Sequence, residues 1–595
     1  MKEFRKLLPF AHGYKFIYAL AMIAIIFSQL FNTFSPLIIK TTIDSIIGSE
    51  VIESDVIQSM VNFFGGSAYL VNNLWVLGIL FVLNTGFRGL FLYFKNILAS
   101  KSAENIVRRI RNKLYDNIQR LPYKEHIKLE TGELLQRCTS DVETIRRFLD
   151  IQFVELGGSI FMLFFIFAIM LNLNLKMVLV SFALVPIIFS FALVFFKRVQ
   201  REFEEADKSE ASLSTSLQEN LTGVRVVKAF AREDYEIDKF DIKNTDYRSK
   251  VNKLIESLAL CWSVSDFFSI SQTAIVIIFG TYYVVNGEIS IGTMVAFISY
   301  IHMMIWPIRQ MGRTLTDMGK ATVSIKRIQE VLDKPIERLL VSGEQPEIKG
   351  NIELENVSFS YEKDHEVLKD ISFKVNAGET AAIIGATGSG KSTLVHLLPR
   401  LYDYDKGSIK FDGIELNTID KRWIRKKVGL ILQESFLYAK TIRDNIRLTD
   451  PQMGESRIIG AAKLASIHDD IDSFDRKYDT MVGERGVSLS GGQKQRMAIA
   501  RTIINECPII IFDDSLSAVD TETDKSIREA LAAKGDKVTT IIISHRISTV
   551  SQADKIIVLD KGRIAQIGSH EDLMKEEGLY RRLYDMQSSI DESLV

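Results

Sequence analysis

Eight consecutive residues in the second half of this 595-residue chain have the types and spacing of a phosphate-binding loop. They follow an apolar run, Thr380–Ile384, precede a helical pattern, and fit Gly-x4-Gly-Lys-Ser in the required strand–loop–helix order. Glycines let backbone N–H groups converge on phosphates, Lys391 reaches the β- and γ-phosphates, and Ser392 offers a hydroxyl to Mg²⁺. The predicted ATP-binding residues here are Gly385, Ala386, Thr387, Gly388, Ser389, Gly390, Lys391, Ser392 and Thr393.

A predicted buried strand that ends in a carboxylate follows further along the chain, where Ile509–Phe512 leads into Asp513. In nucleotide hydrolases with such a loop, an aspartate at this place holds the metal ion. Without the phosphate-binding loop, Asp513 would be interpreted as a helix cap. Beside the phosphate-binding loop, it predicts a site for ATP with Mg²⁺.

The elements around these motifs alternate from Asn351 onwards between short β-branched runs and helical patterns. This alternation is typical of an α/β domain. Residues 351–595 are therefore predicted to form an α/β P-loop nucleotide-binding domain. Residues 333–350, which include Pro335 and Pro346, are the predicted linker.

The first part of the chain, residues 1–332, is predicted to be an α-helical six-span transmembrane domain. A helix needs about 20 mostly apolar residues to cross a bilayer, and six stretches meet or approach this. They are residues 16–39, 75–94, 156–175, 177–196, 267–287 and 289–308. Six crossings place both ends on the same side of the membrane.

The distribution of basic residues predicts which side that is. Lys2, Arg5, Lys6 and Lys15 precede the first span, whereas no Lys or Arg lies between residues 40 and 88. Basic residues favour the cytoplasmic side, so both termini are expected in the cytoplasm and the protein in the cytoplasmic membrane. The polar start is not expected to be a cleaved signal peptide.

Two of the predicted cytoplasmic loops, Lys95–Asp150 and Lys197–Asp266, are long and charged. Helical spacing of apolar residues in Ala103–Leu121 and Lys197–Leu221 predicts that the spans continue as long intracellular helices. Any single residue there can be read as solvated surface. As units, the two hairpins are expected to contact the nucleotide-binding domain, because long exposed helices need packing partners.

Between the two nucleotide motifs, Leu489–Gln493 reads Leu-Ser-Gly-Gly-Gln. With this segment, nearly the whole chain resembles the ATP-binding-cassette (ABC) exporters, specifically half-transporters of the multidrug type. The resemblance implies a type IV ABC exporter-like fold. It also implies that Tyr361 stacks on adenine, that Gln433 is the Q-loop glutamine beside the metal, and that His545 is the switch histidine. The implied signature and D-loop residues are Ser490, Gly491, Gly492, Gln493, Ser517, Ala518 and Asp520.

Each of these residues has an ordinary reading when it is considered alone. Tyr361 could be a packed strand aromatic, Gln433 a surface amide and His545 a core histidine. Their shared order around the phosphate-binding loop favours the functional reading.

The resemblance extends to the cytoplasmic loops. Thr131–Leu135 and Gly223–Phe230 are similar to the family's intracellular-loop sequences, which makes residues 122–130 and 222–231 candidate coupling helices. Gly483–Gly486 resembles the segment that senses the partner's membrane loops. In family members the signature faces the opposite chain's phosphate-binding loop, so the resemblance implies a dimer with a second ABC half-transporter and ATP between the two cassettes.

One position departs from the family pattern. Efficient family members have Glu directly after the metal-holding Asp, whereas this chain has Asp514 after Asp513. Asp514 is one methylene shorter, and misplacing a reacting group by about 1 Å can cost roughly a hundredfold in rate. The catalytic residues Asp514, His545 and Gln433 are thus expected to hydrolyse ATP weakly. Since the signature is intact, a heterodimer with one competent site is predicted, and a slow homodimer is the alternative.

The transported molecule is not specified by the sequence. Polar groups within spans are costly and suggest a pathway. Candidate pathway residues are Arg88, Asp266, His302 and Trp306. The first two could instead snorkel or form an interhelical pair, and the last two could be packing residues. Many Phe and Met side chains nearby favour small amphipathic substrates, either drugs or lipids.

Other function classes are disfavoured or left open. The net charge of -1 gives no reason to expect nucleic-acid binding, and the three scattered cysteines do not suggest a disulfide framework or a zinc site. A lipid flippase, a siderophore importer and an ATP-gated channel or regulator on the same scaffold remain alternatives to drug export.

Overall fold

The computed structural model describes residues 2–48, 55–337, 343–362, 365–483, 486, 488–516, 519–533 and 538–593. The chain divides into two compact units. One, the helical unit, comprises residues 1–119 and 129–334. The other, the cassette unit, comprises residues 120–128 and 335–595.

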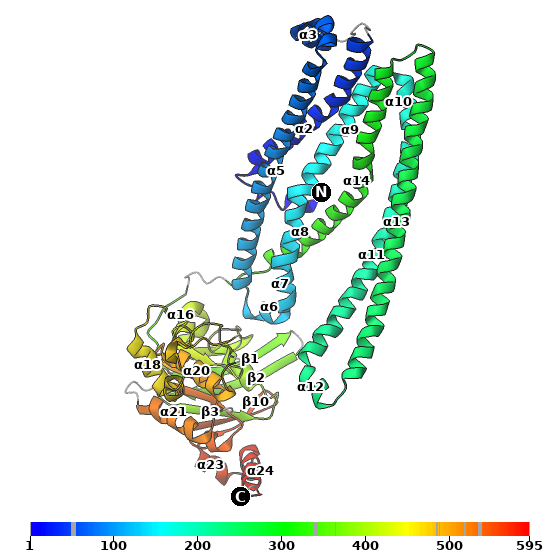
Figure 1. Ribbon diagram of the computed structural model, residues 1–595. Helices are drawn as coiled ribbons and strands as arrows, with labels where there is room; N and C mark the ends of the chain where they lie inside the picture. The colour runs from blue at the N-terminus through cyan, green and yellow to red at the C-terminus, as the bar shows by residue number, and fades with distance from the viewer. Residues whose placement is uncertain are drawn as a thin grey trace. The chain divides into compact units, whose positions relative to one another are not determined.

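The helical unit contains long helices that continue well beyond the length of a membrane crossing. Figure 1 shows α11 and α13 side by side over most of their length. The described elements are α1 (Lys2–Arg5), α2 (Lys15–Thr41), η1 (Thr42–Ile47), α3 (Asp55–Phe63), α4 (Gly66–Asn72), α5 (Leu74–Gln119), α7 (Thr131–Gln136), η2 (Arg137–Asp141), α8 (Val142–Arg147), η3 (Phe148–Gln152), α9 (Phe153–Leu173), α10 (Leu175–Phe182), α11 (Val185–Thr222), α12 (Val224–Ala229), α13 (Glu233–Val285) and α14 (Ile291–Leu332).

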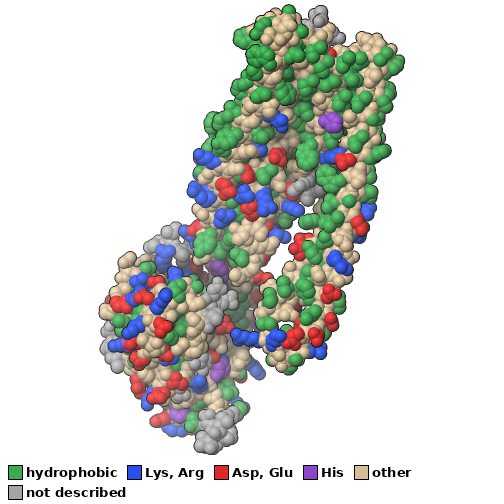
Figure 2. All heavy atoms as spheres, viewed as in Figure 1, with side chains coloured by type: hydrophobic (Ala, Val, Ile, Leu, Met, Phe, Trp, Pro, Cys, Tyr) green, Lys and Arg blue, Asp and Glu red, His purple; other side chains and the backbone are tan. Residues whose placement is uncertain are grey.

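Five helices among the described residues are long and apolar enough to cross a membrane: Lys15–Ile47, Leu74–Gln119, Thr131–Leu173, Glu233–Val285 and Ile291–Gln310. The prediction of six spans is therefore confirmed only as a multi-span helical domain. Figure 2 shows hydrophobic side chains crowding one end of this unit and charged side chains gathering toward the other. This separation is what helices that extend from a bilayer into water require.

The fourth predicted span, residues 177–196, is interrupted. Helix α10 ends at Phe182 and α11 begins at Val185. Pro186 lies in the first turn of α11. In a continuous helix its ring would crowd the carbonyl of Phe182 and its missing N–H would leave that carbonyl without a donor, which favours the break. The side-chain amide of Gln272 in α13 donates to the carbonyl oxygen of Ser181, so a neighbouring helix satisfies part of the interrupted backbone.

The cassette unit has two sheets. The larger sheet has the order β10-β9-β3-β8-β7-β6, in which all neighbours pair in parallel except β10 with β9. The smaller sheet is antiparallel, in the order β2-β1-β4-β5. The strands are β1 (Ile352–Glu362), β2 (His365–Val375), β3 (Thr380–Gly385), β4 (Lys406–Phe411), β5 (Ile414–Glu415), β6 (Val428–Ile431), β7 (Ile509–Asp513), β8 (Thr539–Ile543), β9 (Lys555–Asp560) and β10 (Arg563–Gly568).

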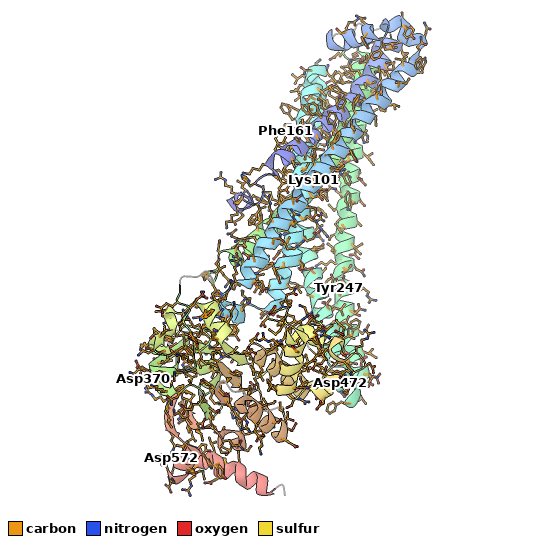
Figure 3. All side chains as sticks on the ribbon, turned by 90° about the vertical axis from the view of Figure 1, so that its left-hand side faces the viewer. Lys101, Phe161, Tyr247, Asp370, Asp472 and Asp572 are labelled. Carbon is orange, nitrogen blue, oxygen red and sulfur yellow. The ribbon has the colours of Figure 1, made fainter. Side chains whose placement is uncertain are left out.

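Helices surround these sheets. They are α6 (Tyr123–Lys128), α15 (Lys391–Leu397), η4 (Leu416–Thr418), α16 (Lys421–Lys427), α17 (Ile442–Ile446), α18 (Glu455–Leu464), α19 (His468–Asp472), η5 (Lys477–Asp479), α20 (Gly491–Ile503), α21 (Thr521–Ala533), α22 (Ile547–Val550), α23 (His570–Lys575) and α24 (Leu579–Ser593). The aspartates labelled in Figure 3 mark three parts of the unit: Asp370 in β2, Asp472 at the end of α19 and Asp572 in α23.

The segment Arg120–Lys128 belongs to the cassette unit although its neighbours in sequence belong to the helical unit. The ring of Tyr123, at the start of α6, packs against the apolar core between the two sheets. The backbone N–H of Glu337 donates to the carbonyl oxygen of Arg120 at 2.6 Å. Short helices thus lie within both segments expected to be coupling helices, α6 within 122–130 and α12 within 222–231.

Candidate nucleotide site

The phosphate-binding loop connects β3, almost wholly buried, to α15. Gly385 has no room for a Cβ atom, which would lie 2.2 Å from the carbonyl oxygen of Leu559. Gly388 and Gly390 have φ angles of 80° and 100°, a region that favours glycine. The glycines of the predicted motif are therefore required by the backbone path, and α15 starts at Lys391 as the motif predicts.

The Lys391 ammonium group lies over the loop. Its Nζ donates to the carbonyl oxygens of Gly385 at 2.9 Å and of Ala386 at 3.0 Å. Burial lowers the pKa of Lys391, and the carboxylates of Asp514 and Asp513 partly offset this effect. A cation held beside the loop at the start of a helix is suited to bind phosphate oxygens.

Ser392 and Asp513 are brought together although they are far apart in sequence. The Ser392 hydroxyl donates to Asp513 Oδ1 at 2.9 Å. His396, one turn further along α15, places Nε2 3.7 Å from Asp513 Oδ2. Two oxygen donors next to the phosphate-binding loop fit the oxygen preference of Mg²⁺.

Asp514 follows β7 with a φ angle of 47°, which few non-glycine residues adopt. The side-chain amide of Gln433 donates to Asp514 Oδ2 at 3.3 Å. Burial raises the pKa of Asp514 above its ordinary value, opposed by the nearby charges of His545, Lys391 and Arg546 and reinforced by Asp513. Two of the predicted catalytic residues, Asp514 and Gln433, are thus in contact, and the charge of the third, His545, acts on the same carboxylate.

Tyr361 lies next to the phosphate-binding helix. Its hydroxyl donates to Thr393 Oγ1 at 3.0 Å, and burial raises its pKa. The ring packs edge to face against Phe359 and Tyr402, with centroids 5.0 Å and 5.1 Å away. A half-buried aromatic ring fixed beside the loop provides a surface on which a base could stack.

Comparisons with known proteins agree with this geometry. A profile of the ABC transporter transmembrane region matches residues 18–308, and an ABC transporter profile matches residues 368–517. YgaD of Bacillus subtilis (strain 168), named as a candidate multidrug export ATP-binding/permease protein, is 36% identical over 93% of this chain and 94% of its own. The chain belongs to the ABC exporters.

Two further matches cover almost the whole exporter. A Staphylococcus aureus (strain NCTC 8325 / PS 47) protein, also named as a candidate multidrug export ATP-binding/permease protein, is 33% identical over 98% of this chain and 100% of its own. The structure of a bacterial Atm1-family ABC exporter with ATP bound superposes with a TM-score of 0.79 and 26% identity, covering 96% of this chain and 99% of that one. This exporter is therefore an ATPase-coupled transporter that binds ATP and works in a membrane as part of a dimer.

The exporter's signature caps helix α20. The Ser490 hydroxyl accepts a hydrogen bond from the Gln493 N–H at 3.2 Å, and the Gln493 side chain accepts one from the Ser490 N–H at 3.0 Å. The Gln493 amide also donates to Asp470 at 2.9 Å. Ser490 and Gly491 remain exposed and Gly492 half-buried, so this helix start is rigid and accessible.

The other predicted cassette residues are only partly described. Asp520 caps α21 by accepting hydrogen bonds from the Thr523 N–H at 2.8 Å and hydroxyl at 2.7 Å. The D-loop residues Ser517 and Ala518 lie outside the described residues, as do two of the four residues of Gly483–Gly486. The carbonyl oxygen of His545 accepts a hydrogen bond from Gln587 at 2.6 Å, and its side chain is exposed.

Among the predicted pathway residues, Asp266 has a defined partner. Arg309 in α14 pairs with Asp266 Oδ1 at 2.7 Å and also donates to the Ser265 carbonyl at 2.9 Å and the Ser269 hydroxyl at 2.6 Å. This is the interhelical pair that the sequence left open. Arg88, His302 and Trp306 are exposed on the exporter's helices. Sequence reasoning missed Arg309, which immediately follows the sixth apolar stretch.

Proposed function

We propose that this chain is one half of a heterodimeric ABC exporter that moves small amphipathic molecules, drugs or lipids, out across the cytoplasmic membrane. In this proposal the ATP site built on its own phosphate-binding loop hydrolyses weakly, and the partner's site is competent. The observation that carries the proposal is the position of Asp514. It lies where an efficient catalytic glutamate would stand, with its carboxylate 3.3 Å from the Gln433 amide.

The length of the side chain supports weak hydrolysis. Asp514 is held on a backbone with a positive φ angle, and its N–H donates to the Ile543 carbonyl oxygen at 3.0 Å. The backbone therefore cannot easily shift toward a γ-phosphate to make up for the missing methylene. Placement of the attacking water depends on such distances.

Magnesium fits the residues present. Ser392, Asp513 and Gln433 would hold it, since all three offer oxygen atoms and the first two already lie 2.9 Å apart. The ion would neutralise charge on the phosphates. Lys391 would bind the same phosphates, and Tyr361 would stack on the adenine.

The signature supports the role of the partner. Ser490, Gly491, Gly492 and Gln493 form the capped start of a 13-residue helix, and a helix start binds anions well. We assign it to the nucleotide held by the other chain's loop. The D-loop residues Ser517, Ala518 and Asp520 and the switch residue His545 would complete the shared site.

For the membrane domain we propose six crossings with both termini in the cytoplasm. The interrupted segment of α10 and α11 would be the fourth crossing. Charged helix extensions on one side of the apolar band favour this topology. In the pathway we retain Arg88, His302, Trp306 and the Asp266–Arg309 pair, which presents both an anion and a cation to an amphipathic substrate.

The test is an ATPase measurement on reconstituted protein. The chain alone is expected to bind MgATP with near-background turnover. Co-purified with its partner half-transporter, whose catalytic Glu is changed to Gln, it should remain slow, and Asp514→Glu should then raise turnover about 10- to 100-fold. Asp514→Asn is the matched control and should stay at background. Brisk turnover by the unaltered chain alone would establish the homodimer instead.

A further inference from the structure

We propose that His396 is a positioning residue that connects the metal-holding carboxylate of Asp513 to Tyr123 at the start of α6. Through this contact, the position of the segment Arg120–Lys128 would set how well Asp513 holds its ion. The inference rests on the proposed function of Asp513 as the residue that holds Mg²⁺.

His396 and Ser392 approach the same carboxylate from one face of α15. They are four residues apart, so their side chains are neighbours on the helix surface. Ser392 donates to Asp513 Oδ1 at 2.9 Å, while His396 Nε2 lies 3.7 Å from Oδ2. The helix that begins at the phosphate-binding loop thus contacts both oxygens of Asp513.

The imidazole is enclosed but incompletely satisfied. Its side chain is 16% exposed, and buried Nε2 has no hydrogen-bond partner among the residues that the structure describes. A separation of 3.7 Å is too long for a hydrogen bond. A shift of about 0.8 Å would bring Nε2 and Asp513 Oδ2 into bonding distance, so a small movement of the ring changes what holds Asp513.

Tyr123 determines where that ring lies. Its ring meets His396 edge on, with centroids 6.1 Å apart, and meets Tyr402 with centroids 5.5 Å apart. Tyr402 in turn packs against Tyr361 at 5.1 Å. One aromatic side chain of α6 therefore contacts the phosphate side of the site through His396 and the adenine side through Tyr402.

The direction of the effect follows from these contacts. If α6 is displaced, Tyr123 no longer confines the imidazole, and Asp513 loses a neighbour on its Oδ2 side. Binding of ATP itself, through Lys391 and the loop amides, does not involve His396. The link should therefore alter the Mg²⁺ requirement and leave metal-free nucleotide affinity unchanged.

The experiment measures binding of trinitrophenyl-ATP to the complete exporter, first in EDTA and then during a Mg²⁺ titration. His396→Ala is expected to leave affinity in EDTA within twofold and to raise the Mg²⁺ concentration for half-maximal effect at least about fivefold. His396→Gln, which can place a nitrogen near the same position, should restore most of the loss. Tyr123→Leu should shift the requirement in the same direction, and adding it to His396→Ala should produce no further shift.

The matched control is His468→Ala. His468 also pairs with a tyrosine, Tyr478, with ring centroids 6.1 Å apart and a 2.9 Å hydrogen bond, but it lies in α19. It should leave the Mg²⁺ requirement unchanged. An unchanged Mg²⁺ requirement in His396→Ala would overturn the inference. Fully additive effects of His396→Ala and Tyr123→Leu on the Mg²⁺ requirement would also overturn it. If Asp513→Asn also leaves the requirement unchanged, the assignment of Asp513 fails first.

Discussion

The carboxylate of Asp44 accepts a hydrogen bond from the backbone N–H of Gly292 at 2.6 Å. This contact joins the end of the first long helical segment, at η1, to the first turn of α14. The same carboxylate accepts a hydrogen bond from Ser290 and pairs with Lys40 at 3.3 Å. With 4% of Asp44 exposed, the position depends on these partners.

Gly292→Ala should destabilise the helical unit by about 1–3 kcal/mol. A Cβ atom there would lie 2.5 Å from Asp44 Oδ1. Gly319→Ala, on the same helix with no atom of the described residues within 4 Å of its Cβ, is the control and should be neutral or stabilising by about 0.5–1 kcal/mol. Thermal unfolding in detergent measures both. Equal effects of the two would show that crowding at Asp44 is unimportant.

Glu337→Gln should destabilise the cassette unit by about 2 kcal/mol. Arg425 donates hydrogen bonds to both carboxylate oxygens of Glu337 at 2.8 Å, and Lys421 Nζ lies 3.6 Å from Glu337 Oε1. Burial alone would raise the pKa of Glu337, but these cations outweigh it and hold the pKa below its ordinary 4.5. The stabilisation is therefore complete above pH 4.5 and is lost as the pH falls through the lowered pKa.

Unfolding measured across an acid pH series checks this prediction. The variant should lose part of the acid sensitivity of the unaltered protein. Glu355→Gln is the comparison, because its pair with Lys410 at 2.9 Å is half exposed and should contribute little. A pH dependence unchanged by Glu337→Gln would contradict the assignment.

Arg309→Ala should cost about 1–2 kcal/mol in the helical unit, and more than Asp266→Ala. The Arg309 side chain is 14% exposed and has three partners on α13, whereas the Asp266 side chain is 58% exposed. Arg309→Lys should not restore the lost stability, since a lysine ammonium group cannot reproduce the several hydrogen bonds that the planar guanidinium group donates in fixed directions. Arg88→Ala, at an exposed position, should not change thermal stability. A larger loss in Asp266→Ala than in Arg309→Ala would reverse this ranking.

The nucleotide site was largely predictable from the sequence because its requirements are local. Gly388 and Gly390 are needed for positive φ angles, and Lys391 follows them at fixed spacing. The interruption before Val185 was not predicted, although Pro186 was a visible signal, because membrane helices often tolerate proline. Arg309 was missed because pathway residues were sought within the apolar stretches, and the sixth stretch was ended at the residue before Arg309.

The contact between Tyr123 and His396 had no sequence signal. It depends on how the short helix α6 lies against a strand–loop–helix unit encoded much later in the chain. Such long-range packing follows from tertiary structure and not from periodicity. The partner of Asp266 was likewise not predictable. An interhelical pair was considered from the sequence, but which residue would form it with Asp266 was not.

Because nine residues encoded between two membrane-domain helices fold with the cassette, the gene order does not mark where one module stops and the other starts. A fragment beginning at Pro335 would leave Tyr402 without the ring of Tyr123 and Glu337 without the carbonyl of Arg120. Recombination that exchanged only residues 335–595 between exporters would therefore transfer an incomplete nucleotide-binding unit. Successful swaps should carry residues 120–128 with it.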